Sequence, residues 1–187
     1  MNTQTKSTNQ SNNSIKNTKT YSIVLIALFA ALTAVFSQIS FPIGPIPINL
    51  GLLAVFISSG LLTVGKSVLS QAVFLLIGAV GVPVFANFKG GLSALVGPTG
   101  GYLLGYIISA FAISLILAKF GKKIYQIAIA LSVGLIICYA FGTLWYVVST
   151  NTSFIDALFL CVTPFIIGDV IKIIVATTLI CKLKKFI

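Results

Sequence analysis

Long apolar runs, each ended by a short polar or glycine-rich segment, make up the chain from about residue 21 onward. A helix needs around 20 consecutive apolar residues to cross a bilayer. We therefore predict an all-α membrane protein with six transmembrane helices, at about 21–41, 49–64, 67–83, 99–118, 124–148 and 155–181. The second and third segments are short, and residues 64–67 must form a tight turn between them. A single re-entrant segment over 49–83 is the alternative, and it would leave five spans.

The first 20 residues differ from the rest, because they are rich in Asn, Thr, Ser and Lys and show no apolar periodicity. This composition is typical of disorder. We predict a disordered cytoplasmic tail over 1–20 and one six-helix membrane domain over 21–187. The first apolar run is too long for a signal-peptide core and lacks a convincing cleavage site, so we interpret it as a span.

The composition also indicates a membrane protein. Hydrophobic residues make up 58% of the chain and charged residues only 7%, with a mean hydropathy of +1.11. A soluble domain carries roughly 25% charged residues. The net charge of +10 does not indicate nucleic-acid binding, since the lysines are scattered between apolar runs without a basic stripe or a recognition motif.

The positions of the lysines favour six spans. With both termini in the cytoplasm, every lysine except Lys89 and Lys172 falls in a cytoplasmic segment. Lys89 faces outward, and Lys172 lies inside the last apolar run. This is the positive-inside pattern, and the five-span alternative destroys it.

Several kinds of chemistry are excluded by residue type. The chain has no histidine and no arginine, which removes most metal ligands and every histidine-based catalytic triad. Cys138, Cys161 and Cys181 lie in apolar runs and are interpreted as small core residues. We therefore expect no metal, no cofactor and no catalytic residue, so that the chain is not an enzyme.

Asp169 and Lys172 are the most informative residues. The chain has two acidic residues, and one of them, Asp169, lies deep in the last apolar run. A charge at mid-bilayer costs about 2.5–3.5 kcal/mol on translocon scales. Three residues apart on a helix, the two side chains share a face. We interpret them as a ligand site or ion path; a buried pair that only fixes helix packing is the alternative.

Two outer loops follow from the predicted orientation. The first, over 41–49, carries three prolines that make it a stiff extended segment. The second, over 83–98, mixes aromatics, glycines, one amide and the outward lysine. Apolar loops at a membrane surface are expected to fold back over something, so we predict that these two form a lid. An ordinary interfacial loop is the alternative for the second.

Five segments, in the correct order over about 35–180, resemble the BioY family: Gly44–Ile48, Gly81–Phe85, Gly90–Leu92, Gly97–Gly105 with its Gly-Pro-Thr-Gly-Gly-Tyr block, and Gly168–Lys172. These are the biotin-specific S-components of energy-coupling factor (ECF) transporters. The resemblance implies a six-helix membrane protein without a nucleotide site. It also implies association with a transmembrane coupling subunit and two cytoplasmic ATPases, which alone use ATP.

One segment departs from the family pattern. Where the family usually continues with Thr-Leu-Gln-Thr, this chain has Asn49-Leu50-Gly51-Leu52. The glutamine and the second threonine are missing, and Asn49 replaces the first threonine as a hydrogen-bond donor.

The chemistry of biotin suits the residues present. Asp169 can accept from the ureido N–H groups, while Lys172 and Asn87 can donate to the carbonyl or the carboxylate. Aromatic side chains are candidate walls for the thiophane ring. From the matching blocks and their neighbours we predict these substrate contacts: Asn87, Asp169, Lys172, Tyr102, Phe85, Asn49 and Gly97, with Tyr139, Trp145 and Phe88 as further aromatic candidates.

The first span contains two overlapping Ala-x-x-x-Ala patterns, Ala27 with Ala31 and Ala30 with Ala34. Small residues four apart give a smooth strip for close helix contact. The family resemblance implies that the coupling subunit docks there.

Three other functions remain open. One is a self-sufficient carrier in which Asp169 takes up a proton, although the charge of Lys172 opposes this. Another is an S-component for a different vitamin. A membrane enzyme is the third, and the residue types present argue against it.

Overall fold

The computed structural model describes residues 19–41 and 46–185. The prediction of a disordered tail therefore lies outside the described residues, apart from Lys19 and Thr20, which already belong to the first helix. The middle of the first outer loop, 42–45, also lies outside them.

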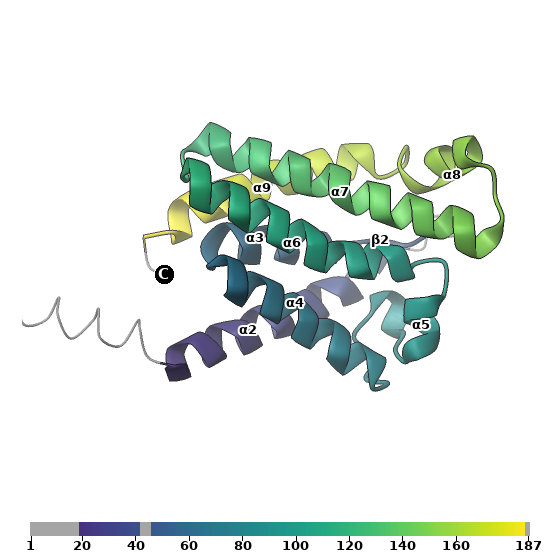
Figure 1. Ribbon diagram of the computed structural model, residues 1–187, viewed down its shortest axis with the longest axis horizontal. Coiled ribbons are helices and arrows are strands. Elements are labelled where there is room, and N and C mark those ends of the chain that lie inside the picture. Colours follow the sequence, from purple (N-terminus) through teal and green to yellow (C-terminus); the bar gives the residue numbers. More distant parts are fainter. Residues whose placement is uncertain (1–18, 42–45, 186–187) are drawn as a thin grey trace, which may run out of the picture.

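Helices account for nearly all of the described chain (Figure 1). The helices are α2 (Lys19–Gln38), α3 (Gly51–Leu61), α4 (Val64–Ala79), α5 (Leu92–Val96), α6 (Gly100–Phe120), α7 (Ile124–Thr150), α8 (Phe154–Cys161) and α9 (Ile166–Leu183), with a short 3-10 turn η1 (Ala86–Phe88). Two short strands, β1 (Ser40–Phe41) and β2 (Ile48–Asn49), pair antiparallel with Ser40 opposite Asn49. The all-α prediction is confirmed at this level.

Three of the described helices, α2, α6 and α7, are long and apolar enough to cross a membrane. The pair α8 and α9 gives a fourth span if it is counted as one, although the two helices are bent by 52°. The sequence predicted one continuous segment here. The break contains Pro164, whose ring and missing N–H interrupt a helix. Helices α3 and α4 are apolar but shorter.

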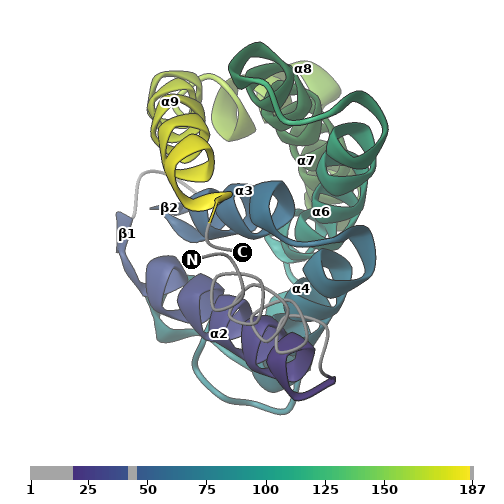
Figure 2. The ribbon, with the colours of Figure 1, turned by 90° about the vertical axis from the view of Figure 1, so that its left-hand side faces the viewer.

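Helix α3 lies at the centre of the bundle, between α2, α4, α6 and α9 (Figure 2). All 11 of its residues are buried. Its sequence is apolar all round except for Ser58 and Ser59, whose hydroxyls bond back to the Val55 carbonyl. A helix that is apolar on every side is buried in a protein core or in a membrane, and α3 is enclosed by its neighbouring helices. A helix so enclosed can be shorter than the bilayer is thick.

The α3–α4 connection differs from the predicted turn at residues 64–67. The chain turns at Leu62 and Thr63, and α4 already begins at Val64. Ser67 is therefore helical and buried, where its hydroxyl bonds Ser59 at 3.2 Å. Gln71 lies one turn further along α4 and donates to Ser58 at 3.1 Å. Hydrogen bonds between small polar side chains hold the two helices together, and they require the earlier turn.

Short backbone and side-chain bonds hold the described parts of the outer loops. The described ends of the first loop pair as the antiparallel strands β1 and β2. Gln38, at the end of α2, holds residues 83–88 of the second loop. Its amide donates to the carbonyls of Pro83 at 3.1 Å and Phe85 at 3.2 Å. Its oxygen accepts from the Phe88 N–H at 3.1 Å.

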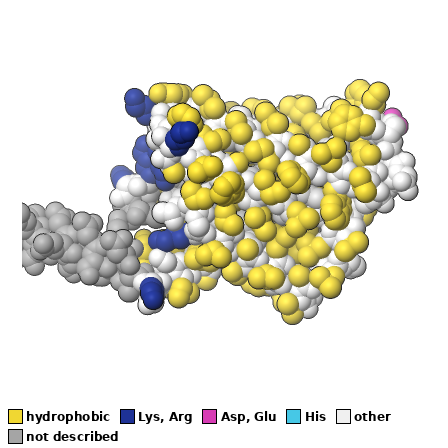
Figure 3. Space-filling view, viewed as in Figure 1, with side chains coloured by type: hydrophobic (Ala, Val, Ile, Leu, Met, Phe, Trp, Pro, Cys, Tyr) yellow, Lys and Arg dark blue, Asp and Glu magenta, His cyan; other side chains and the backbone are white. Residues whose placement is uncertain are grey.

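Most of the described lysines lie at one end of the molecule, an acidic side chain lies at the other end, and apolar side chains cover the face of the bundle between them (Figure 3). The described lysines at this end lie where α2 and α4 begin and where α6 and α9 finish, and in the α6–α7 connection. Lys122 lies in that connection and donates to the carbonyl of Leu61. Lys184, directly after α9, donates to the carbonyl of Lys122 at 2.8 Å. Burial, together with the nearby charge of Lys184, lowers the pKa of Lys122.

Candidate functional site

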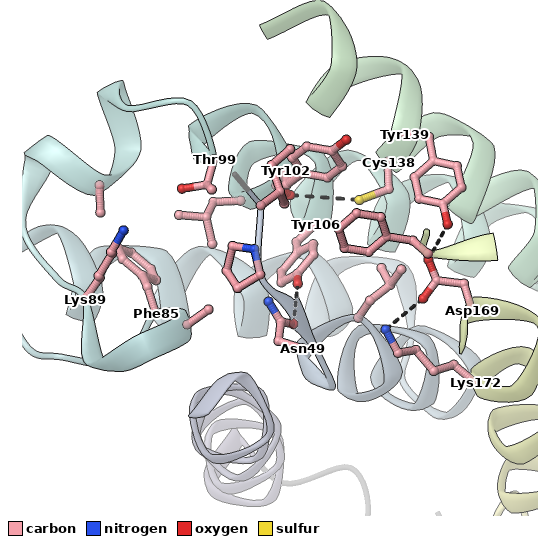
Figure 4. A pocket seen from close by; sticks show the side chains of 17 residues that line it. Asn49, Phe85, Lys89, Thr99, Tyr102, Tyr106, Cys138, Tyr139, Asp169 and Lys172 are labelled. Atoms are coloured by element: carbon pink, nitrogen blue, oxygen red, sulfur yellow. Dashed lines mark hydrogen bonds and ion pairs between the residues drawn. The ribbon is translucent and has the colours of Figure 1, made fainter. Parts of the chain in front are cut away.

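A cavity lies beneath the two outer loops, at the end of the bundle opposite to most of the described lysines, although Lys89 and Lys172 line it. We call it the main cavity, and it has about 730 Å³ of free space, part of it open to the exterior. Its walls come from β2, α3, the second outer loop, α6, α7 and the start of α9 (Figure 4). Ligand sites are mostly apolar clefts with a few placed polar groups, and the lining of the main cavity fits that description.

Asp169 and Lys172 lie in the wall of the main cavity and form an ion pair. The Lys172 ammonium donates to Asp169 Oδ1 at 2.7 Å, and the Tyr139 hydroxyl donates to Asp169 Oδ2. Asp169 is 2% exposed and Lys172 is 6% exposed. A carboxylate offers about four acceptor sites and an ammonium three donors. Both groups can therefore bind a ligand while remaining paired.

The position of the Asp169–Lys172 pair argues against a role that is limited to helix packing. Both members lie on α9, one turn apart, so the pair itself does not join two helices. The link from α9 to α7 is made instead by Tyr139. The pair's position in the cavity wall favours a role in ligand binding.

The structure brings five of the predicted contact residues together. Asn49, Phe85, Tyr102, Asp169 and Lys172 all line the main cavity. The Tyr102 hydroxyl donates to the Cys161 carbonyl at 3.1 Å and so ties α6 to α8. Phe85 is almost fully buried and meets Phe74 edge to face, with ring centroids 5.5 Å apart.

Close packing against a glycine fixes the ring of Phe85. A Cβ added at Gly78 would lie 2.0 Å from that ring, so α4 presents bare backbone to the phenyl group. The phenyl side chain is thereby held as one wall of the main cavity.

Asn87 and Gly97 do not line the main cavity. Asn87 is exposed with a left-handed φ of 59°. Its side-chain oxygen accepts from the Ser40 hydroxyl at 2.7 Å, which ties the second outer loop to β1. The Gly97 carbonyl accepts from the Trp145 indole at 3.0 Å. Both residues therefore organise the loop in this structure, and their ligand contacts stay predictions.

Of the further aromatic candidates, one lines the main cavity and two do not. Tyr139 lines the main cavity, whereas Trp145 does not. Phe88 is 71% exposed on the surface of the second loop. An exposed aromatic there is suited to the membrane interface.

Sequence reasoning did not single out several residues that line the main cavity: Tyr106, Cys138, Thr99, Leu52 and Phe165, among others. Helical spacing carried a signal for some of them. Tyr106 lies four residues after Tyr102, and Phe165 lies four residues before Asp169. Positions four apart share a helix face. No comparable signal pointed to Leu52, which belongs to a helix buried on all sides.

A second cavity lies behind the first. It has about 640 Å³ of free space between the two strands, α3 and α9, and Asn49 and Lys172 line both cavities. These two side chains therefore form part of the wall between them. The neighbouring Ile171 and Phe41 are exposed apolar residues, so the second cavity lies toward the lipid-facing side of the bundle.

The alanine patterns of α2 lie on two different faces. Ala27 and Ala31 are exposed, beside the exposed apolar residue Leu28. Ala30 is buried and Ala34 is half-buried against the bundle. Of the two strips, only the first is available to another protein.

Within residues 19–41 and 46–185, no group of three His, Cys, Asp or Glu side chains is placed so that it could hold a metal ion. Cys138 and Cys161 are buried and Cys181 is half-buried, and all three are free thiols.

Comparisons with known proteins agree with these observations. The model of the BioY family matches residues 5–187. A biotin transporter BioY from Thermotoga maritima is 40% identical over 164 residues, which cover 87% of this chain and 95% of that protein. The biotin transporter BioY2 of Lactococcus lactis subsp. cremoris is 37% identical and covers 87% and 90%.

A solved structure extends the likeness to the fold. The crystal structure of an S-component for biotin from an ECF-type ABC transporter superposes with a TM-score of 0.84 at 26% identity. The match covers 89% of this chain and 92% of that one. The relatives are named as transporters rather than as enzymes. The chain is a multi-pass membrane protein that belongs to the BioY family.

Proposed function

We propose that this chain binds biotin in the main cavity and serves as the substrate-binding membrane subunit for its uptake. The observation that carries the proposal is the Asp169–Lys172 pair, which places one acceptor and one cationic donor in the wall of a largely apolar cavity. The biotin transporters among the relatives support the choice of ligand. Charge-assisted hydrogen bonds in such a site are the strong kind.

The chemistry of biotin matches the cavity group by group. Asp169 accepts from the ureido N–H groups, while Lys172 and Asn49 donate to the ligand's carbonyl or carboxylate oxygens. Phe85, Tyr102 and Tyr139 supply aromatic surface for the thiophane ring. Asn87 and Gly97 contribute by holding the second loop in place over the site.

We also propose a membrane arrangement of six spans, with α8 and α9 together as the sixth and both termini in the cytoplasm. The lysines support this arrangement, since they gather at the end of the bundle that would face the cytoplasm (Figure 3). The main cavity then opens outward, beneath the two loops. Helix α3 is about 16 Å long at 1.5 Å per residue, and its complete burial accounts for its short length.

Uptake requires partners, and the proposed partners are an ECF coupling subunit and two ATPase subunits. The similar crystal structure is that of an S-component of an ECF-type ABC transporter, which supports this assignment. We place the docking surface on the exposed strip of Ala27 and Ala31, because small side chains four residues apart allow close helix contact. Ala30 and Ala34 pack inward and support the helix from behind.

A self-sufficient proton-coupled carrier is the competing proposal. It needs a carboxylate that gains and loses a proton during transport. Asp169 is paired with Lys172 and accepts from Tyr139, and protonating the carboxylate would break this ion pair in every transport cycle. Coupling to partner ATPases therefore agrees better with the site.

Binding and uptake measurements separate these functions. Purified protein in lipid nanodiscs should bind labelled biotin in preference to other labelled vitamins, and preferential binding of another vitamin would redirect the proposal. Ala31→Trp should leave biotin binding intact while partner-dependent uptake falls, and Ala30→Trp, which mispacks the bundle, is the contrasting variant. Uptake that persists without ATPases and follows the proton gradient would favour the carrier.

A further inference from the structure

The side-chain amide of Asn49 is held in one orientation by two donors. The backbone N–H of Gly51 lies 2.8 Å from Asn49 Oδ1. Because a backbone N–H can only donate, the amide atom that faces it must be the oxygen. The hydroxyl of Tyr106 donates to the same oxygen at 3.2 Å. The hydrogen-bond network therefore fixes which end of the amide faces Tyr106.

The consequence is that the nitrogen of Asn49 points the other way. Figure 4 shows the bond between the Tyr106 hydroxyl and the Asn49 oxygen, and the nitrogen takes no part in it. Asn49 lines the main cavity. Within the described part of the chain, no acceptor is bonded to Nδ2. Its two N–H groups are thus available to a ligand.

Gly51 makes this arrangement possible. A Cβ added at Gly51 would lie 2.5 Å from the Ser37 hydroxyl, 3.0 Å from Asn49 Oδ1 and 3.1 Å from the Tyr106 hydroxyl. Polar groups from α2, β2 and α6 therefore converge on the start of α3, in the space that a side chain would fill. Ser37 is 2% exposed, and its hydroxyl has no described partner.

We propose that Tyr106 is a positioning residue, which holds Asn49 so that its N–H groups face the main cavity and select a hydrogen-bond acceptor on the ligand at that place. The inference rests on the proposed binding of biotin and adds a specificity determinant to it. Beside Lys172, the free end of the Asn49 amide presents only donors, and Asp169 is the one carboxylate among the described lining residues. A carbonyl or carboxylate oxygen is accepted at this wall, and an N–H group is rejected.

The first test is a double-mutant cycle on biotin affinity, measured in nanodiscs. Tyr106→Phe removes one hydroxyl and keeps the ring, which stacks on Phe74 with centroids 6.4 Å apart. We expect Tyr106→Phe to weaken binding about three- to tenfold and Asn49→Ala to weaken it at least as much. The double variant should bind no more weakly than Asn49→Ala alone. Tyr125→Phe, at an exposed tyrosine outside the cavity, is the matched control and should bind normally.

The cycle distinguishes positioning from direct contact. If Tyr106→Phe costs as much in the Asn49→Ala background as in the native protein, the hydroxyl touches the ligand itself and the proposal is wrong. If Tyr106→Phe has no effect in the native protein, the hydroxyl does not hold Asn49, and the proposal is equally wrong.

A second variant tests the donor assignment. Asn49→Asp keeps the shape and keeps an oxygen for Gly51 and Tyr106, but it places an oxygen where Nδ2 stood. Affinity for biotin should fall at least tenfold, because a carboxylate oxygen of the variant would then face an acceptor oxygen of the ligand. Unchanged or tighter binding would show that Asn49 does not donate to the ligand.

The orientation of Asn49 is also measurable without any ligand. In protein labelled with ¹⁵N-asparagine, the Nδ2 signal of Asn49 is the one lost in Asn49→Ala. Tyr106→Phe should shift this signal and leave those of the other asparagines in place, and an unmoved signal would overturn the proposal. If native protein does not bind biotin, the proposed function fails, and this signal still decides whether Tyr106 orients Asn49.

Discussion

Two groups of polar side chains inside this bundle have different surroundings, and only one of the two borders a cavity. Asp169, Lys172 and Asn49 line the main cavity. The other group lies between α3 and α4: Ser58, Ser59, Ser67, Ser70 and Gln71, all with no exposed surface. Its side chains bond mainly one another and nearby carbonyls. We call it the serine cluster.

The difference separates a binding role from a packing role. In the serine cluster, every hydroxyl donates to a carbonyl or to another hydroxyl of the cluster, and each link joins neighbouring turns or the two helices. Around the main cavity, the Lys172 ammonium and the Asn49 amide keep N–H groups beyond those used in described bonds. Buried polarity alone therefore does not mark a ligand site. Unused hydrogen-bonding capacity beside a cavity does.

The largest expected effect comes from the charged pair. Asp169→Asn and Lys172→Ala should each weaken biotin binding at least tenfold, equal to about 1.4 kcal/mol or more, because each removes a charge-assisted bond to the ligand. Equilibrium binding of labelled biotin to purified protein measures the loss. Both variants should still insert and purify. Normal binding by both would assign the pair to the same packing role as the serine cluster.

An intermediate effect is expected from the wall formed by Phe85. Gly78→Ala places a methyl group where the Phe85 ring lies, so the ring must move and the main cavity changes shape. We expect about fivefold weaker biotin binding and a loss of roughly 1–3 kcal/mol of stability from overpacking. Gly65→Ala is the control on the same helix, because a Cβ there meets nothing within 4 Å. Equal behaviour of the two variants would contradict the proposed wall.

A smaller effect is expected where α2 holds the second outer loop. Gln38→Ala removes the hydrogen bonds to Pro83, Phe85 and Phe88. Amide hydrogen exchange over residues 84–88 should speed up, and biotin affinity should fall about two- to threefold. Added biotin should slow exchange over 84–98 in the native protein. If exchange is the same with and without ligand, these residues do not act as a lid.

The smallest effect on binding is expected in the serine cluster. Gln71→Met keeps the volume of the side chain and removes its amide, while Ser58 and Ser70 keep their own bonds to carbonyls. Thermal unfolding should shift by the equivalent of about 1 kcal/mol or less, and biotin affinity should not change. A tenfold loss of affinity would mean that the two groups are coupled through α3.

Long, strongly apolar segments could be predicted from the sequence, and their ends could not. The segments that became α2, α6 and α7 were placed within a few residues. The α3–α4 turn was placed too late because Gly65 and Lys66 looked like turn residues, whereas the bonds of Ser67 and Gln71 require helix there. The bend before α9 was missed although Pro164 marked it.

The site residues that could be predicted are those whose chemical type is unusual in a membrane segment. Asp169 and Lys172 stood out because charge is costly in a membrane. Tyr106 shares a helix face with Tyr102, but the sequence does not reveal its role, which depends on the distance to Asn49, 57 positions away in sequence. Asn87 was chosen for its amide, but its left-handed backbone and its bond to Ser40 are tertiary features.

The most direct test of the central claim is a structure of the protein with biotin bound. The account predicts the ligand in the main cavity, with polar atoms of biotin within about 3.2 Å of the Asp169 carboxylate and the Lys172 ammonium. The thiophane ring should lie against Phe85, Tyr102 or Tyr139. Biotin bound elsewhere, or bound in the main cavity without a polar contact to Asp169 or Lys172, would contradict the account.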